Sequence, residues 1–191
     1  MIARRHFLML PVAAYPRLGV TAPGQLQITE VDERDITVRR VDQGFAVDLD
    51  AFFPVRPAVA WAVLTDYEHM SAFVPNLTSS TVAGRGEGPF NVVQKGVARF
   101  GPFSFAFESV REIRLTPPTE IRSHGIGGNL ERVESATRLQ AEGSGTRLHY
   151  HADVVPGVWF PPLMGPAVVR AQTARQFSAM LAEMRRRDTG G

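Results

Sequence analysis

The chain carries polar side chains that could orient a bound molecule, but no motif of fixed spacing that would carry out a reaction. None of its 191 residues is cysteine, which excludes a thiolate nucleophile, a cysteine-ligated zinc and an iron–sulfur cluster. The composition does not exclude a Ser-His-Asp triad, but the sequence contains no nucleophile-elbow motif. It also shows no paired carboxylates and no cofactor fingerprint. We therefore assign no catalytic residue and expect no cofactor.

The histidines suggest a metal site only superficially. His149 and His151 alternate along a predicted strand, which puts both imidazoles on one side. A structural zinc site needs about four ligands, and no further histidine or carboxylate is obviously convergent here. We expect these two side chains and His124 to face solvent, and we assign no metal ligand.

Asp66 and a run of three glycines could each have a chemical role, but the sequence favours a structural one. Asp66 could act as an acid, but its position at the end of a predicted helix favours hydrogen bonds to nearby backbone. Gly84, Gly86 and Gly88 resemble a phosphate-binding loop. Because they join two predicted strands and open no helix, no helix dipole is available to hold a phosphate.

A run of aromatic residues is the most informative feature for binding. Phe103, Phe105 and Phe107 lie on one face of a predicted strand. Each such ring buries about 150–250 Å², so three in a row form either a solid core or one wall of a pocket. A single phenylalanine is more often core, whereas a whole inward face beneath a helix favours a pocket. The polar residues expected to orient a ligand there are Tyr150, Gln94, Ser135 and Thr137.

The elements that must position these side chains follow from hydrophobic periodicity. Alternation predicts strands over 36–41 and 45–53, the second with Phe45, Val47, Leu49, Ala51 and Phe53 on one face. Prolines then introduce two short helices, over 57–67 and 68–73. Glycine and proline turns separate six further strands, over 77–82, 90–100, 103–115, 120–126, 130–140 and 146–155.

The last segment is a long amphipathic helix over about 163–187. Its apolar stripe consists of Val169, Thr173, Phe177, Met180, Leu181 and Met184 at three- and four-residue spacing. We include Val169, Thr173 and Phe177 among the expected ligand-binding residues. The element order predicts an α+β domain over 35–187 in which a curved antiparallel sheet wraps around this C-terminal helix.

Several stretches resemble a known superfamily. Residues 59–67 (VAWAVLTDY), 73–77 (FVPNL) and 143–150 (GSGTRLHY) are similar to the START-like, birch-allergen-like helix-grip superfamily, SRPBCC. Within it, the chain resembles the branch of polyketide cyclase/dehydrase-like and coenzyme Q-binding proteins. The resemblance covers about residues 44–187 and implies a hydrophobic cavity between sheet and helix. The family often has Gly-Asp where this chain has Gly128-Asn129, and a tryptophan in the strand where it has residues 135–137.

The resemblance implies three possible functions. The first is a carrier or sensor of a hydrophobic small molecule, namely a lipid, an isoprenoid quinone such as ubiquinone, or an aromatic polyketide-like compound; contact with membranes would be transient. The second is an aromatase/cyclase acting on a polyketide-like chain, in which Tyr150 or His149 would be needed for turnover. The third is an interaction module for a ribosome or protein partner, for which Arg185 to Arg187 would supply positive charge.

Net charge and the N-terminus bear on partners and location. The charge is only +2, and the excess of arginine lies near the two ends, so we expect no DNA partner. Residues 1–24 contain RRHFL followed by a short apolar stretch, which resembles a twin-arginine export signal of bacterial type. They are either such a signal, which would make the protein periplasmic, or an N-terminal arm on a cytoplasmic protein.

Overall fold

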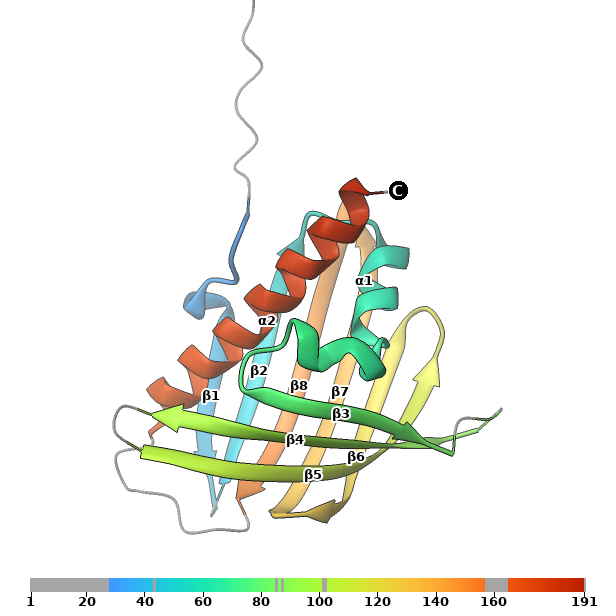
Figure 1. Ribbon diagram of the computed structural model, residues 1–191. Helices are drawn as coiled ribbons and strands as arrows, with labels where there is room; N and C mark the ends of the chain where they lie inside the picture. Colours follow the sequence, from blue (N-terminus) through green and yellow to red (C-terminus); the bar gives the residue numbers. More distant parts are fainter. Residues whose placement is uncertain are drawn as a thin grey trace, which may run out of the picture.

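One antiparallel sheet of eight strands forms the frame of the protein in a computed structural model (Figure 1). The structure describes residues 28–42, 44–84, 86, 88–100, 103–156 and 165–190. The strands are β1 (Ile36–Val41), β2 (Gly44–Phe53), β3 (Leu77–Ala83), β4 (Phe90–Phe100), β5 (Phe103–Thr116), β6 (Glu120–Gly128), β7 (Leu130–Glu142) and β8 (Gly145–Pro156). Their order across the sheet is β1-β2-β8-β7-β6-β5-β4-β3, so β3 to β8 form a meander and β2 pairs with β8.

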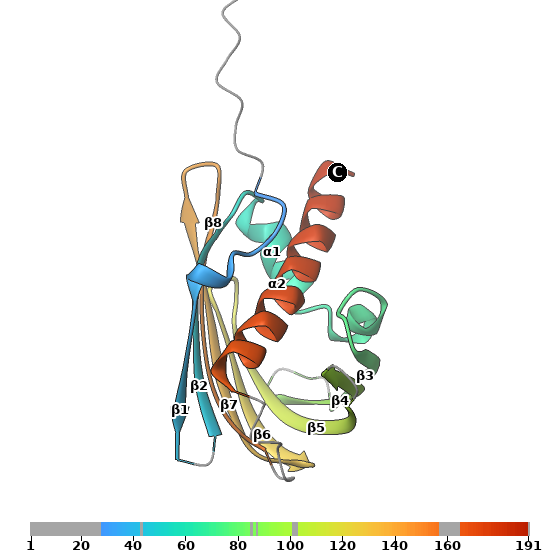
Figure 2. The same ribbon diagram turned by 90° about the vertical axis from the view of Figure 1, so that its left-hand side faces the viewer.

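The sheet is strongly curved. In Figure 1, strands β1, β2, β8 and β7 run upright and β3, β4 and β5 cross in front of their lower parts; Figure 2 shows the two groups on opposite sides, which leaves a concave inner face. Register shifts interrupt the pairing at Leu77/Ser79, Val110/Arg111 and Leu130/Arg132. Such bulges bend a strand and increase its twist, so they contribute to the curvature. The sheet does not close, because β1 and β3 are both edges.

The predicted amphipathic helix is α2 (Pro166–Thr189), and it lies across the concave face (Figure 2). Its buried side chains are Ala174, Phe177, Met180, Leu181 and Met184. The first residues of the predicted stripe, Val169 and Thr173, are only half-buried. This arrangement confirms the predicted α+β helix-grip architecture, because burial of one helix face against a bent sheet is what holds the two layers together.

Two short helices cover one end of the sheet, as the prolines predicted. α1 (Pro57–Leu64) ends earlier than expected, and the second is a 3-10 helix, η2 (Tyr67–Ala72); another 3-10 turn, η1 (Glu33–Asp35), precedes β1. The hydroxyl of Thr65 donates to the carbonyl of Trp61 at 2.8 Å and so occupies one of the last carbonyls of α1.

The expectation that Asp66 bonds to nearby backbone is wrong. Its side chain caps no backbone group of η2; it accepts from Nη2 of Arg187 at 2.7 Å and lies 2.6 Å from Nδ1 of His69. Burial alone would raise the pKa of Asp66, but these two hydrogen bonds lower it below its ordinary value. Arg187 is 121 positions away in sequence, so this bridge between the α1–η2 corner and α2 exists only after folding.

The described N-terminal segment also contacts α2. The backbone N–H of Val31 donates to Oγ of Ser178 at 2.9 Å, and Nη1 of Arg185 donates to the carbonyl of Ile28 at 3.0 Å. The segment 1–24, with its predicted export signature, lies outside the described residues. Among the helices of the described part, none has the length and apolar character needed to span a bilayer.

Candidate ligand-binding cavity

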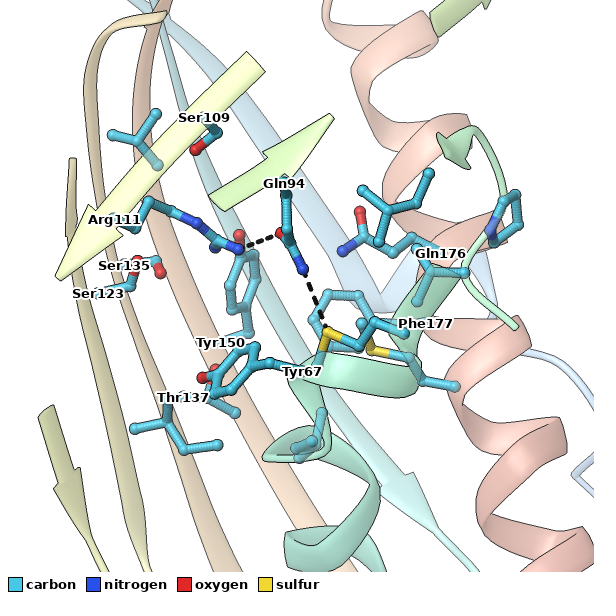
Figure 3. Close-up of a pocket in the computed structure, with 18 of the residues that line it drawn as sticks. Tyr67, Gln94, Ser109, Arg111, Ser123, Ser135, Thr137, Tyr150, Gln176 and Phe177 are labelled. Atoms are coloured by element: carbon cyan, nitrogen blue, oxygen red, sulfur yellow. Dashed lines mark hydrogen bonds between the residues drawn. The ribbon is translucent and has the colours of Figure 1, made fainter. Parts of the chain in front are cut away.

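A cavity of about 260 Å³ lies between the concave sheet face, η2 and α2 (Figure 3). Its apolar lining includes Leu64, Met70, Leu77, Phe107, Ile121, Val133, Phe177 and Met180. Its polar lining consists of Tyr67, Gln94, Ser109, Arg111, Ser123, Ser135, Thr137, Tyr150 and Gln176. The inside of the fold is therefore not filled by its own side chains, and polar and apolar side chains contribute about equally to the lining of the space.

Six of the ten expected ligand-binding residues meet at this cavity. They come from β4, β5, β7, β8 and α2, and they are Gln94, Phe107, Ser135, Thr137, Tyr150 and Phe177. The side chains of Phe103 and Phe105 lie outside the described part of the structure. Among the described residues, the lining does not include Val169 or Thr173, whose hydroxyl donates to the carbonyl of Val169 along the helix at 2.9 Å.

Gly96 makes room for the aromatic ring of Phe107. The two residues are register partners on β4 and β5, and a Cβ at position 96 would lie 2.5 Å from Cζ of that ring and 2.1 Å from the carbonyl oxygen of Asn76. That carbonyl accepts from the backbone N–H of Val97 at 2.8 Å. Only glycine permits the ring and the chain before β3 to approach β4 this closely, so a residue without a side chain helps to shape the cavity wall.

Arg111 is the main cavity residue that sequence analysis missed. It lies on β5 with Ser109 and Ile113 on the inward face, two alternations after Phe107. Its Nη2 donates to Oε1 of Gln94, and the amide nitrogen of Gln94 donates to Oγ of Ser80 at 3.1 Å. Burial lowers the pKa of Arg111 below its ordinary value. A guanidinium nevertheless remains charged in proteins, so the cavity contains a cation.

Two tyrosines add further polar groups. Burial raises the pKa of Tyr67 to about 12 and raises that of Tyr150 as well, while nearby Arg111 opposes both shifts. Both phenols are therefore protonated at neutral pH and can donate hydrogen bonds. Their rings are held by aromatic contacts: Tyr67 with Phe90 at 5.8 Å between centroids, and Tyr150 with Phe177 at 5.0 Å.

The histidines lie on the other side of the sheet. Nδ1 of His151 is 2.7 Å from Asp48, which raises the pKa of the imidazole, and Nδ1 of His149 is 3.3 Å from Asp50. His149 therefore faces away from the cavity that its neighbour Tyr150 lines. A search of the described residues for three or more histidine or carboxylate side chains able to hold one metal ion found no such group.

The departure at Gly128-Asn129 has a structural reason. Oδ1 of Asn129 accepts from the backbone N–H of Glu108 at 2.9 Å, and Nδ2 donates to the carbonyl of Ala106 at 3.0 Å. An aspartate could make the first bond but not the second, because an ionised carboxylate only accepts. Asn129 thus ties the turn before β7 to β5, whose inward residues line the cavity.

The curved sheet, the long helix α2 across its concave face and the cavity between them define a helix-grip protein. A family model described as "Polyketide cyclase / dehydrase and lipid transport" matches residues 53–182, and the chain belongs to this family. No match was found among curated proteins.

Solved structures show the same architecture. The Zhui aromatase/cyclase from a Streptomyces species is 17% identical with a TM-score of 0.63, covering 79% of this chain and 96% of that one. A STAR-related lipid transfer protein from Xanthomonas axonopodis is 13% identical with a TM-score of 0.64, covering 78% and 92%. A START superfamily protein from Mycobacterium smegmatis is 13% identical with a TM-score of 0.54, covering 76% and 97%. At these identities the likeness shows the fold alone.

Proposed function

We propose that the protein binds a small hydrophobic molecule in the cavity between sheet and α2 and acts as its carrier or sensor. The observation that carries this proposal is the unfilled space of about 260 Å³, which is lined by apolar side chains on which polar groups converge. Among the ligands that the resemblance implies, a compact aromatic compound or a short acyl chain fits this space better than a long isoprenoid tail.

The polar lining supports binding through donated hydrogen bonds. Arg111, Tyr67 and Tyr150 are all donors at neutral pH, and Gln94 is held by its own bonds to Ser80 and Arg111. Groups fixed in this way can orient an oxygen of the ligand without moving. The side chains of Met70 and Met180 can adapt to the rest of the molecule, because thioether chains fill irregular spaces.

A matched pair of substitutions on β7 tests the proposal. Ser135 lines the cavity, whereas the next residue, Ala136, lies on the outer surface of the sheet. Ser135→Phe is expected to fill the space and abolish saturable binding of hydrophobic probes by isothermal titration calorimetry. Ala136→Phe should leave binding unchanged. Mass spectrometry of molecules released from denatured wild-type protein should detect a bound hydrophobic compound that is absent from the Ser135→Phe variant.

Two results would count against a binding function. One is a wild-type protein that releases no compound and shows no saturable binding to quinone, fatty-acid or polyaromatic probes. The other is equal binding by the Ser135→Phe and Ala136→Phe variants when circular dichroism shows both to be folded, since the bound probe would then lie outside the cavity.

A second candidate function is an aromatase/cyclase, favoured by the family description and by the fold shared with the Streptomyces enzyme. Its test is turnover of a poly-β-keto chain to a cyclised product. Tyr150→Phe removes a hydroxyl that borders the cavity, and His149→Ala changes the adjacent outward residue and serves as the control. If the wild-type protein and His149→Ala form product and Tyr150→Phe does not, the result supports an enzyme. If the wild-type protein binds the chain without forming product, the result supports a carrier.

The C-terminal arginines have partners within the fold. Arg186 and Arg187 both donate to Glu183 at 2.7 Å, and Arg187 also donates to Asp66. Deleting Arg185 to Arg187 would therefore disturb the attachment of α2 in addition to any ribosome or protein contact. Substituting Arg186 alone, whose guanidinium is largely exposed, tests an interaction module more cleanly.

A further inference from the structure

Arg111 is a largely buried arginine that lines the cavity, and no carboxylate of the described part of the chain forms an ion pair with it. On the outer face, Arg114 pairs with Glu112 at 2.8 Å, and Arg122 pairs with Glu120 at 3.1 Å. Inside the cavity, the hydrogen-bond acceptor on Arg111 is the neutral amide oxygen of Gln94. A buried charge is costly unless an opposite charge and hydrogen bonds compensate it.

Two donors beside the cavity are also unused. Nε of Arg111 and Oγ of Ser123 are both buried, and neither has a hydrogen-bond partner among the described residues. Both residues line the cavity, from the neighbouring strands β5 and β6, and Ser123 pairs in register with Ser135 on β7. Figure 3 shows Arg111, Ser123 and Ser135 along the same wall. Buried polar atoms usually have partners, so this wall is suited to a ligand that brings acceptors.

The guanidinium is held in position before any ligand arrives. Gln94 accepts from Nη2 of Arg111 with its oxygen, while its nitrogen donates to Ser80 and lies 3.4 Å from the sulfur of Met70. The amide therefore has a defined orientation and fixes the plane of the guanidinium. A fixed guanidinium presents parallel N–H groups that match the two oxygens of a carboxylate.

The α2 side of the cavity supplies apolar surface. Phe177 and Met180 of α2 offer a ring and a thioether beside Gln176, and Tyr150 packs against Phe177. A molecule bound here would place a polar end on the β5–β6 wall and an apolar body toward α2.

We infer that the ligand of this cavity carries a carboxylate that binds Arg111, with Ser123 as a second donor, on a compact apolar body. This inference rests on the proposed function, because it names the chemical class of the molecule that the cavity takes. The inference is more specific than the proposed function, since the proposed function would also include a neutral hydrophobic compound.

Matched pairs of acids and amides test the inference. The probes are 2-naphthoic acid and 2-naphthamide, with octanoic acid and octanamide as a pair of different shape, titrated at pH 7 by calorimetry. Each acid is expected to bind wild-type protein at least about tenfold more tightly than its amide, because a hydrogen bond to a charged group contributes more than a neutral one. In Arg111→Gln this preference should fall to about twofold or less, because the acid loses more affinity than the amide.

The control is Arg114→Gln, the same substitution on the outer face of the same strand, which should keep the wild-type preference. If Arg111→Gln does not fold, Arg111→Lys and Ser123→Ala replace it, and each should reduce the acid preference by a smaller factor. Acid affinity should also fall below about pH 4.5, where a free carboxyl group becomes protonated, while amide affinity stays constant.

The outcomes distinguish a failure of the proposed binding function from a failure of the carboxylate inference. If none of the four probes binds saturably to wild-type protein, the proposed binding function fails. If acids and amides bind equally well, or if the acid preference persists in folded Arg111→Gln, the cavity binds ligands but the carboxylate inference is overturned.

Discussion

Replacing Phe177 by alanine should weaken the hold of α2 on the sheet. This side chain is only 4% exposed, it contacts the ring of Tyr150, and it borders the cavity. Core Phe→Ala substitutions cost about 3–5 kcal/mol, a range that includes the lost aromatic contact. Because part of the ring borders the cavity, we expect a loss near the lower end, about 3 kcal/mol. For a protein of this size that corresponds to a fall of about 6–12 °C in Tm.

Urea unfolding followed by far-UV circular dichroism measures this loss. The control is Gln176→Ala, which changes the preceding residue of α2; that side chain borders the cavity but is exposed, so its removal should change the free energy of unfolding by no more than about 0.5 kcal/mol. A loss below about 1 kcal/mol for Phe177→Ala would refute the reasoning, since it would mean that burial of this ring does not attach the helix to the sheet.

Two further substitutions test polar contacts, one within α2 and one between β8 and the segment after β2. Hydrogen bonds from Arg186 and Arg187, against an opposing effect of burial, lower the pKa of Glu183 from 4.5 to about 2, so its stabilising contribution is complete above pH 4.5 and declines as the pH falls toward 2. Glu183→Gln should therefore lower the free energy of unfolding by about 1–2 kcal/mol at pH 7, and a urea series should show the difference shrinking between pH 4.5 and 2; a constant difference would contradict this. Thr146→Val should cost about 1–3 kcal/mol by the same assay, because the buried hydroxyl donates to the carbonyl of Val55 at 2.8 Å, whereas Thr146→Ser should cost less.

Strand positions were predictable because alternation and turns are local properties of the chain. β1 matches its predicted bounds, and the predicted inward face of β2, from Phe45 to Phe53, is buried throughout. Proline at position 57 correctly indicated the start of α1. The second short helix was harder to define, since the change from α to 3-10 geometry at Tyr67 depends on how η2 packs beneath the sheet.

The charged contacts were not predictable in the same way. The partner of Asp66 is Arg187, and only the path of α2 across the sheet brings them together. Arg111 could have been found, because it alternates with Phe107 and Ile113 on β5 and therefore shares their inward face. Residue type favours an exposed position, because an arginine in a strand usually faces solvent. Only the alternation along β5 indicates that this arginine faces inward.

Alternation along a strand predicts which face a residue lies on only where no bulge interrupts the strand. The shift opposite Val110 and Arg111 adds its extra residue to β6, so the alternation of β5 through Arg111 is unbroken. The shift on β7 occurs at Leu130/Arg132, before Ser135 and Thr137, which therefore stay on one face. Both segments that supply polar groups to the cavity thus have regular alternation.

The space itself follows from which residues occupy these inward positions. Ser135 and Thr137 line the cavity on β7, the strand where the family resemblance leads us to expect a tryptophan. A serine or threonine fills far less of the interior than an indole and leaves a hydroxyl at the surface of the space. The small side chains at these positions leave room beside Arg111, so under the proposed function the guanidinium and the hydroxyl groups of the cavity would select the ligand.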